Sequence, residues 1–446
     1  MAAMTNADTI SRFAAGVRER ELPDAALDAA RFCVADWYGV ALGARGLAAV
    51  DALSRVASSW GTQGKSPVLS GGTAAAPAAA LVNGMMAHCL DFDDTHVGSI
   101  AHLSGPTWAA AWAAATEVGA SPSAALRGFV AGFEVGARLG NGGFGVGTNE
   151  RHIHSTGVFG CIAAATAAAC VYGLDAARLQ RAIGLACTQV GGLTASFGTP
   201  AKPFHAGKAA FNGVLSAQMA REGYDAATDL VEPGGGLDRA MVQDKSFQIE
   251  ALDFSDGWEL NRNTFKPYAS CLLTHPVIDA GKVLAGQIGP RGVAKIRVHV
   301  HPLAIQLAGK PTATTPYEGK FSLAFTTALS LTGRQAAQRD FTDETVKEAA
   351  LQSLLRKVVL VPTAGMALTA ATLEVQLEDG TVLSEHTPLA LGNPGRAMSW
   401  DDMQAKFASL TDATLGEQRT RQLFGVLRAI DTETGWDRIA SLLSPA

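Results

Sequence analysis

A strongly polar stretch at residues 88–105 separates two runs of small apolar residues, and this contrast limits how the chain can fold. Residues 74–87 are small and apolar and residues 106–118 are rich in Ala and Trp, so both runs predict buried helices. Between them lie His88, Asp91, Asp93, Asp94, Thr95, His96 and His102. Burying such groups without partners costs free energy, so we expect them to form a functional site.

Three interpretations of this polar stretch are open. In the first, Asp91 or Asp93 caps a helix and the histidines lie on a solvated surface. In the second, the stretch binds a metal ion, although its spacing matches neither a His-Glu-x-x-His helix nor a calcium loop closed by Glu. The third, which we favour, is an acid–base site for an organic acid.

Length and charge restrict the class of protein. At 446 residues the chain exceeds the size at which one core usually stops growing, which predicts two domains. The formal net charge of −5 and the lack of a dense Lys/Arg run provide no basic field for nucleic acid. We therefore expect no nucleic-acid partner, and a local cluster of Lys and His would indicate a small anionic ligand.

Neither the cysteines nor the apolar runs indicate secretion or a membrane. The six cysteines are scattered without a Cys-x-x-Cys pair and are predicted to be buried thiols. Residues 1–12 resemble neither a secretory nor a transit peptide, which predicts a cytoplasmic protein. The Ala-rich runs at 74–87 and 161–171 are too short or interrupted to span a bilayer, so no membrane partner is expected.

Helical periodicity dominates the first half of the chain. Apolar spacing predicts helices at residues 5–19, 24–43, 122–139, 161–172 and 176–190. The Gly-rich segment 140–147 follows a helix and lacks the Gly-Lys-Ser/Thr of a phosphate loop, so we predict a mobile loop that covers the site. The polar segment 198–205 precedes a helix predicted at 207–222. The backbone N–H groups in the first turn of this helix would bind an anion together with the side chains of Lys202 and His205.

The pattern changes after a Pro- and Gly-rich segment at residues 232–246. Strands are predicted at 295–301, 372–377 and 381–386, and helices at 273–286, 320–332 and 343–356. The final segment is helical again. The sequence therefore predicts a mainly α fold with a large helical domain (residues 1–269 and 396–446) and a smaller α+β domain (residues 270–395).

Several motifs, in the same order, resemble those of one enzyme family. They are Leu-Asp-Phe-Asp-Asp-Thr at 90–95, His-Leu-Ser-Gly at 102–105, His-Ser-Thr-Gly at 154–157, Lys-Pro-Phe-His-Ala-Gly-Lys at 202–208, Lys-Pro-Tyr-Ala-Ser-Cys at 266–271 and Lys-Phe-Ser-Leu at 320–323. Over nearly its whole length the chain resembles the MmgE/PrpD family, which includes 2-methylcitrate dehydratase, cis-aconitate decarboxylase and iminodisuccinate epimerase. The resemblance implies a homodimeric enzyme that acts on a di- or tricarboxylate in a cleft between its two domains.

Eight residues are predicted to form this site. The predicted catalytic residues are Asp91, His102, His154 and Lys266. The predicted substrate-binding residues are Thr95, Lys202, His205 and His275. The resemblance implies six of them, whereas His205 and His275 are added because they could bind substrate carboxylates together with the lysines. The same cations would stabilise the charge that develops when a proton leaves the carbon beside a carboxylate. Neither a Rossmann fingerprint nor iron–sulfur spacing is present, so we predict no cofactor and no metal.

One departure from the family pattern bears on the reaction. Relatives that dehydrate or decarboxylate often have Phe-Ser-x-x-Tyr, whereas Phe325 occupies the Tyr position here, so that a proton-donating phenol is absent. The chain also resembles iminodisuccinate epimerase in length. We therefore predict epimerisation of iminodisuccinate. The alternatives are hydro-lyase or decarboxylase activity on 2-methylcitrate- or cis-aconitate-like acids, and non-catalytic binding of a polycarboxylate.

Overall fold

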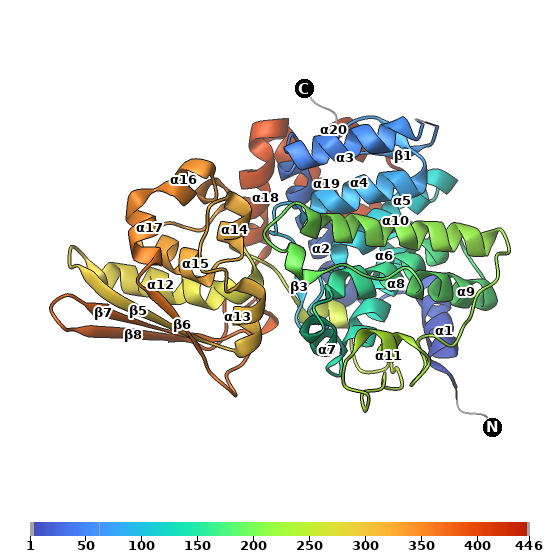
Figure 1. The fold of residues 1–446 in the computed structure, drawn as a ribbon. Helices are drawn as coiled ribbons and strands as arrows, with labels where there is room; N and C mark the ends of the chain where they lie inside the picture. Colours follow the sequence, from blue (N-terminus) through green and yellow to red (C-terminus); the bar gives the residue numbers. More distant parts are fainter. Residues whose placement is uncertain (1–3, 62, 444–446) are drawn as a thin grey trace.

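The structure is a computed structural model that describes residues 4–61 and 63–443. Helices form most of it, and a smaller part on the left of Figure 1 combines helices with a four-stranded sheet. This architecture confirms the predicted fold class, mainly α with a smaller α+β part. Every helix in the described residues is too short or too polar to cross a lipid bilayer.

The large part is built around helices that are apolar on every side. All of α4 (Ala76–His88) except Pro77 is buried, as is all of α8 (Ser155–Val171) except Val171. Such helices lie inside a protein, surrounded by others. The surrounding helices are α1 (Asn6–Glu19), α2 (Asp24–Gly43), α3 (Ala48–Ser59), α5 (Ser104–Val118), α6 (Pro122–Gly140), α9 (Ala176–Cys187) and α10 (Ala201–Arg221).

The predicted helices on either side of the polar stretch are confirmed as α4 and α5. Between them, strand β3 (Thr95–His96) pairs antiparallel with β4 (Asn263–Thr264). This pairing holds the polar stretch against a segment that lies far away in the sequence. Asp91, at the start of the stretch, has a positive φ of 50°, a conformation that non-glycine residues rarely adopt.

A glycine at the crossing of α4 and α10 allows these two helices to approach closely. A Cβ atom on Gly207 would lie 2.3 Å from the carbonyl oxygen of Leu81 in α4. Helix α10 begins at Ala201, whereas the sequence predicted a start at residue 207. Proline is tolerated in a first helical turn, so Pro203 does not delay the helix. Lys202 therefore lies within the first turn of α10.

The smaller part contains one mixed sheet with the strand order β6-β5-β7-β8. Strand β5 (Val293–Val300) pairs parallel with β6 (Val358–Pro362) and antiparallel with β7 (Ala371–Leu377), which pairs antiparallel with β8 (Val382–Thr387). The three predicted strands are confirmed. Strand β6 was not predicted, because its short apolar run has no alternating pattern that would identify a strand.

Helices cover the sheet and connect its strands (Figure 1). The predicted helices at 273–286 and 320–332 are present as α12 (His275–Ile288) and α15 (Leu323–Leu331). The helix predicted at 343–356 is divided at Glu348, whose extended backbone separates α16 (Asp343–Lys347) from α17 (Ala349–Leu355). Two short helices, α13 (Pro302–Ala308) and α14 (Pro316–Lys320), complete this part.

The final helices return to the large part, as Figure 1 shows for α18 and α19. Helix α18 (Trp400–Leu415) packs on α2, where a Cβ atom on Gly39 would lie 2.9 Å from the ring of Phe407. Helices α19 (Glu417–Leu427) and α20 (Asp437–Leu443) follow. The domain boundaries at 269/270 and 395/396 stay a prediction. Residues 1–3, 62 and 444–446 of the predicted domains lie outside the described residues.

The Gly-rich segment at 140–147 is not the mobile loop that the sequence predicted. Helix α6 extends to Gly140, and residues from Phe144 onward form α7 (Phe144–Glu150). Phe144 is fully buried. A Cβ atom on Gly145 would lie 2.2 Å from the carbonyl oxygen of Ser99, so this glycine permits close packing against the polar stretch.

Candidate active site

A cavity lies where the two parts meet, with about 550 Å³ of empty space including its mouth. The large part lines it with the polar side chains of Thr95, His102, Asn149, His154 and Lys202. Four of these five are predicted site residues. Because they come from the polar stretch and from the starts of α8 and α10, the fold brings together groups that are distant in the sequence.

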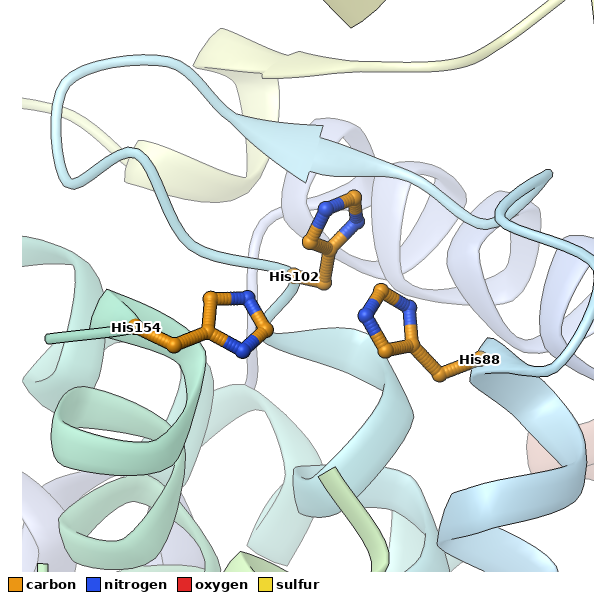
Figure 2. A group of neighbouring side chains, drawn as sticks. All are labelled: His88, His102 and His154. Carbon is orange, nitrogen blue, oxygen red and sulfur yellow. The ribbon is translucent and has the colours of Figure 1, made fainter. Parts of the chain in front are cut away.

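Three buried imidazoles converge beside this cavity (Figure 2). His88 ends α4, His102 precedes α5 and His154 precedes α8. The ring centroid of His88 lies 4.4 Å from that of His102 and 5.9 Å from that of His154. Burial lowers the pKa of all three rings, so they are neutral at neutral pH.

The hydrogen bonds of His102 define which of its nitrogens is free to react. Its Nδ1 lies 2.8 Å from the backbone carbonyl oxygen of Asp94, which can only accept a hydrogen bond. Nδ1 therefore carries the hydrogen, and Nε2 has a lone pair. Burial and then the Lys202 cation lower the pKa of His102 well below 6.5. The ring is thus neutral, lines the cavity and has a nitrogen that could accept a proton there.

The other two imidazoles are held by different partners. His88 Nδ1 lies 2.9 and 2.8 Å from the two carboxylate oxygens of Asp93, and its Nε2 has no hydrogen-bond partner among the described residues. His154 Nδ1 lies 3.1 Å from Nδ1 of His205. Asp93 Oδ2 also lies 3.4 Å from Nδ1 of His102, so this carboxylate links His88 to the proposed base.

Asp91 holds two lysine ammonium groups close to the cavity. Lys202 Nζ donates to Asp91 Oδ1, and Lys266 Nζ lies 3.2 Å from Asp91 Oδ2. Burial alone would raise the pKa of Asp91, but the two cations outweigh it and hold this pKa well below its usual range. Asp91 is therefore a permanent carboxylate, and its fixed charge positions Lys202 at the cavity wall.

Three buried lysines, which we call the lysine cluster, donate hydrogen bonds to three consecutive carbonyl oxygens of the polar stretch. Lys266 Nζ donates to Asp91 O at 2.8 Å, and Lys320 Nζ donates to Leu90 O. Lys406 Nζ donates to Phe92 O at 2.6 Å. These contacts fix the backbone around the unusual conformation of Asp91. Neither Lys320 nor Lys406 was among the predicted site residues. Lys320 begins the Lys-Phe-Ser-Leu motif, whereas Lys406 lies in none of the motifs.

The remaining predicted residues lie outside the cavity wall. Asp91 and Lys266 lie behind Lys202, and His205 contacts His154. His275 begins α12, where its Nε2 lies 3.2 Å from the carbonyl oxygen of Ser270 and its ring faces Tyr268. The structure therefore does not bring His275 to the cavity.

Phe325 is also distant from the cavity wall. It is fully buried in α15 and packs against Phe341 with ring centroids 6.1 Å apart. Because Phe325 does not line the cavity, a missing phenol at this position cannot discriminate between reactions there. Phe325 therefore gives no support to epimerisation over a lyase reaction.

Two groups of side chains offer potential metal ligands: His88 with His102 and His154, and His88 with Asp91 and Asp93. Their ligand atoms lie within 4.8 Å of one another. In the second group Asp91 is already paired with Lys202 and Lys266, so a metal ion there would compete with two lysines for this carboxylate.

We expect activity to be unchanged after treatment with a chelator. The physical reason is that the proposed base and the cations that face the substrate are all side chains of this chain. Activity should be compared before and after dialysis against a chelator, with the metal content measured by mass spectrometry. If activity were lost and then restored by zinc, iron or magnesium, the imidazoles of His88, His102 and His154 would instead be metal ligands.

We also expect kcat/KM to remain constant as the pH falls through 6.5. Burial followed by the Lys202 cation lowers the pKa of His102 and His154 well below 6.5, so both stay unprotonated where a free histidine would gain a proton. The stability due to these neutral rings is fully present above pH 6.5 and is lost as the pH falls through the lower folded-state pKa values. A pH–rate profile with an acid limb centred at 6.5 would contradict this assignment.

Fold and cavity together define a class: two-part, mainly helical proteins with a cavity, lined by polar and apolar side chains, where an α+β part meets a helical part. Residues 8–250 match the MmgE/PrpD N-terminal domain, and residues 268–429 match the MmgE/PrpD C-terminal domain. The chain therefore belongs to the MmgE/PrpD family, as its motifs predicted. Proteins of this family are enzymes.

The chain is similar to several cis-aconitate decarboxylases. It is 25% identical to the enzyme of Aspergillus terreus over 471 residues, which cover 98% of this chain and 95% of the relative. It is 25% identical to the Mus musculus enzyme and 24% identical to the Homo sapiens enzyme. Each of these two matches covers 79% of this chain, with 75% of the mouse and 76% of the human protein.

Proposed function

We propose that the protein is a lyase that breaks a bond beside a carboxylate of a small organic acid. The observation that supports this proposal is the neutral imidazole of His102, which lines the same cavity as the Lys202 cation. Its Nδ1 hydrogen bond leaves Nε2 to accept a proton. Relatives that are cis-aconitate decarboxylases also favour a lyase.

The proposed chemistry needs one cation and two proton carriers. Lys202 would bind the substrate carboxylate and stabilise the negative charge that builds up on its oxygens. In an elimination, His102 removes a proton from the carbon next to that carboxylate, and a second group protonates the leaving hydroxyl. In a decarboxylation, carbon dioxide leaves and the resulting carbanion takes a proton. His154 lines the same cavity and is the candidate second proton carrier in both cases. Its ring is neutral in the free protein, so it would have to take up a proton when the substrate binds before it could act as the donor.

Epimerisation of iminodisuccinate, the reaction predicted from the sequence, is the second candidate. It requires two proton carriers at opposite faces of one carbon. His102 and His154 line the same cavity with ring centroids 6.3 Å apart, which suits such a pair. We rank epimerisation below lyase activity because the argument from Phe325 is not supported.

One experiment in deuterated water separates these reactions. The full chain is incubated with cis-aconitate, 2-methylcitrate or stereopure iminodisuccinate and followed by NMR. A lyase would release carbon dioxide or form a new alkene, whereas an epimerase would place deuterium at the inverted carbon with neither change. Absence of turnover with these acids and with alkyl-bearing analogues would contradict an enzymatic role.

Replacing Lys202 or Lys266 with methionine should lower kcat/KM by roughly ten- to a hundredfold, since losing one charge-assisted contact costs about 1.5–3 kcal/mol. Both ammonium groups are buried beside Asp91, so neither is a surface pair worth about 0–1 kcal/mol. Kinetics should be measured beside a thermal melt. Near-native kinetics in both variants would place the substrate elsewhere, and a larger loss in kcat than in affinity for Lys266→Met would indicate a role in proton transfer.

A further inference from the structure

A second cavity, which we call the Arg45 cavity, lies in the large part. It is bordered by the start of α3, by α20 and by the short hairpin of β1 (Ser66–Pro67) and β2 (Thr73–Ala74), at the top of Figure 1. It encloses about 1030 Å³ of empty space including its mouth. None of its lining residues lines the cavity of the candidate active site, so the two cavities are separate.

The guanidinium of Arg45 lines this cavity with one N–H group unsatisfied. Its Nε donates to the carbonyl oxygen of Leu69 at 2.7 Å, and its Nη2 donates to that of Leu443 at 2.8 Å. Nη1 is buried and has no hydrogen-bond partner among the described residues. Burial lowers the pKa of Arg45, and no carboxylate in the described part of the chain counters this effect. An anion would offset the cost of burying this unpaired cation.

Most of the remaining wall is aromatic or aliphatic. Trp112 and Trp436 line the cavity with ring centroids 6.2 Å apart, and Val68, Ile439 and Leu443 add aliphatic side chains. Trp112 is only 2% exposed, yet its Nε1 has no hydrogen-bond partner among the described residues. A buried indole N–H usually has an acceptor. The cavity wall therefore contains two residues with unsatisfied donors together with a large hydrocarbon surface.

The charge around the cavity limits the ligand to a single acidic group. Asp51, which is exposed in the first turn of α3, is the sole carboxylate among the lining residues that the structure describes. Its negative charge would repel a second anionic group on the ligand. An inorganic anion, in turn, would leave the hydrocarbon surface without a partner.

We propose that the Arg45 cavity is a second ligand site, which binds a small monocarboxylate with an apolar body. The carboxylate accepts a hydrogen bond from Nη1 of Arg45, and the body lies against the indole rings of Trp112 and Trp436. Because Nη1 is not exposed to solvent, neighbouring side chains shift when the carboxylate reaches it. This site is independent of the proposed lyase chemistry.

Calorimetry with the full chain and two matched probes tests the proposal. Phenylacetate carries the acidic group and the apolar body, whereas phenylacetamide has the same body without the charge. Phenylacetate should bind at least about tenfold more tightly, since a hydrogen bond between charged groups commonly contributes that much. Equal affinities of the acid and the amide, or no binding of phenylacetate, would overturn the proposal.

Three variants locate the bound acid. Arg45→Met should weaken binding of phenylacetate by at least about tenfold, because it removes the cation. The matched control is Arg55→Met, since Arg55 is exposed on α3 and does not line the cavity. Lys202→Met, which alters the other cavity, should also leave the affinity unchanged. Binding that is lost in Lys202→Met and kept in Arg45→Met would place the acid in the candidate active site and overturn the proposal.

A milder pair of variants applies if Arg45→Met fails to fold in a thermal melt. Ser70 lines the cavity and is exposed in the turn between β1 and β2, so a longer side chain is tolerated there. Ser70→Glu adds a negative charge next to the segment that Arg45 contacts, whereas Ser70→Gln adds the same shape without charge. Ser70→Glu should weaken binding of phenylacetate but not of phenylacetamide, and Ser70→Gln should affect neither. Equal affinities of the two variants for phenylacetate would overturn the proposal.

Discussion

Replacing His102 with alanine is expected to lower kcat/KM by about 10²–10⁴-fold, which is the usual contribution of a positioned general acid or base. The ring lines the cavity, and its Nδ1 is held by the carbonyl oxygen of Asp94. Alanine removes an imidazole that combines a defined tautomer with a place in the cavity wall. The fold should persist, because Asp93 keeps its contacts with His88.

The kinetics of the His102→Ala variant should be compared with those of His386→Ala. His386 is exposed on β8, where its Nδ1 contacts Thr372, so its removal should leave kcat/KM unchanged. Binding of cis-aconitate to His102→Ala should be measured at the same time. Retained binding with lost turnover would assign the ring to chemistry. Retained turnover would exclude His102 as the base and favour a protein that only binds its acid ligand.

Replacing Lys406 with methionine is expected to lower the free energy of unfolding by about 3–5 kcal/mol, the usual cost of removing one partner of a buried ion pair. Lys406 Nζ lies 2.6 Å from Asp36 Oδ1, and both side chains are buried. Methionine has a similar volume but leaves Asp36 as an uncompensated buried carboxylate. Unfolding by urea, followed by circular dichroism, measures the loss.

The decrease in the free energy of unfolding caused by Lys406→Met should depend on pH. Burial raises the pKa of Asp36 above 3.8 and Lys406 opposes this rise, so the variant should have a still higher value. A raised folded-state pKa means that this contribution to stability is fully present below pH 3.8, the value of the unfolded chain, and is lost as the pH rises through the higher folded-state pKa. The variant should therefore be less impaired at pH 5 than at pH 8.

A surface lysine serves as the control for this measurement. Lys347 Nζ lies 3.9 Å from Asp343 Oδ1 and both side chains are exposed, so Lys347→Met should cost at most about 1 kcal/mol. Similar small losses in both lysine variants would show that the Asp36–Lys406 pair contributes little. The same result would also show that Lys406 of the lysine cluster does not stabilise the site.

Elements whose pattern is local could be predicted from the sequence. Helices α4 and α5 were predicted because each is a continuous apolar run next to the polar stretch. Helix α4 ends where this stretch begins, and α5 begins where it ends. Strands β7 and β8 were predicted because their residues alternate and Asp379-Gly380 forms the turn between them. The start of α10 was misplaced because the polar segment 198–205 was assigned to the loop before the helix, although the first turn tolerates both its polar residues and Pro203.

The site could be predicted only where its residues belong to recognisable motifs. His102, His154 and Lys202 were found in this way and do line the cavity. Lys320 and Lys406 reach carbonyl groups that are 230 and 314 residues away in the sequence. No local pattern can reveal such a contact, because it depends on how the two parts and the final helices pack. His275 shows that a motif can also mislead. It follows the Lys-Pro-Tyr-Ala-Ser-Cys motif, but its side chain does not line the cavity.

The position of Lys406 has a consequence for biosynthesis. The loop at residues 90–92 is synthesised early, but the last of the three ammonium groups that fasten it belongs to α18, which follows the smaller part along the chain. Domains generally fold as units while the chain is being made. The helical core and the sheet can therefore form on the ribosome before this loop is secured. A chain interrupted ahead of α18 would contain every residue that lines the cavity and still lack a finished site, so catalysis should begin only after α18 has been synthesised and has packed.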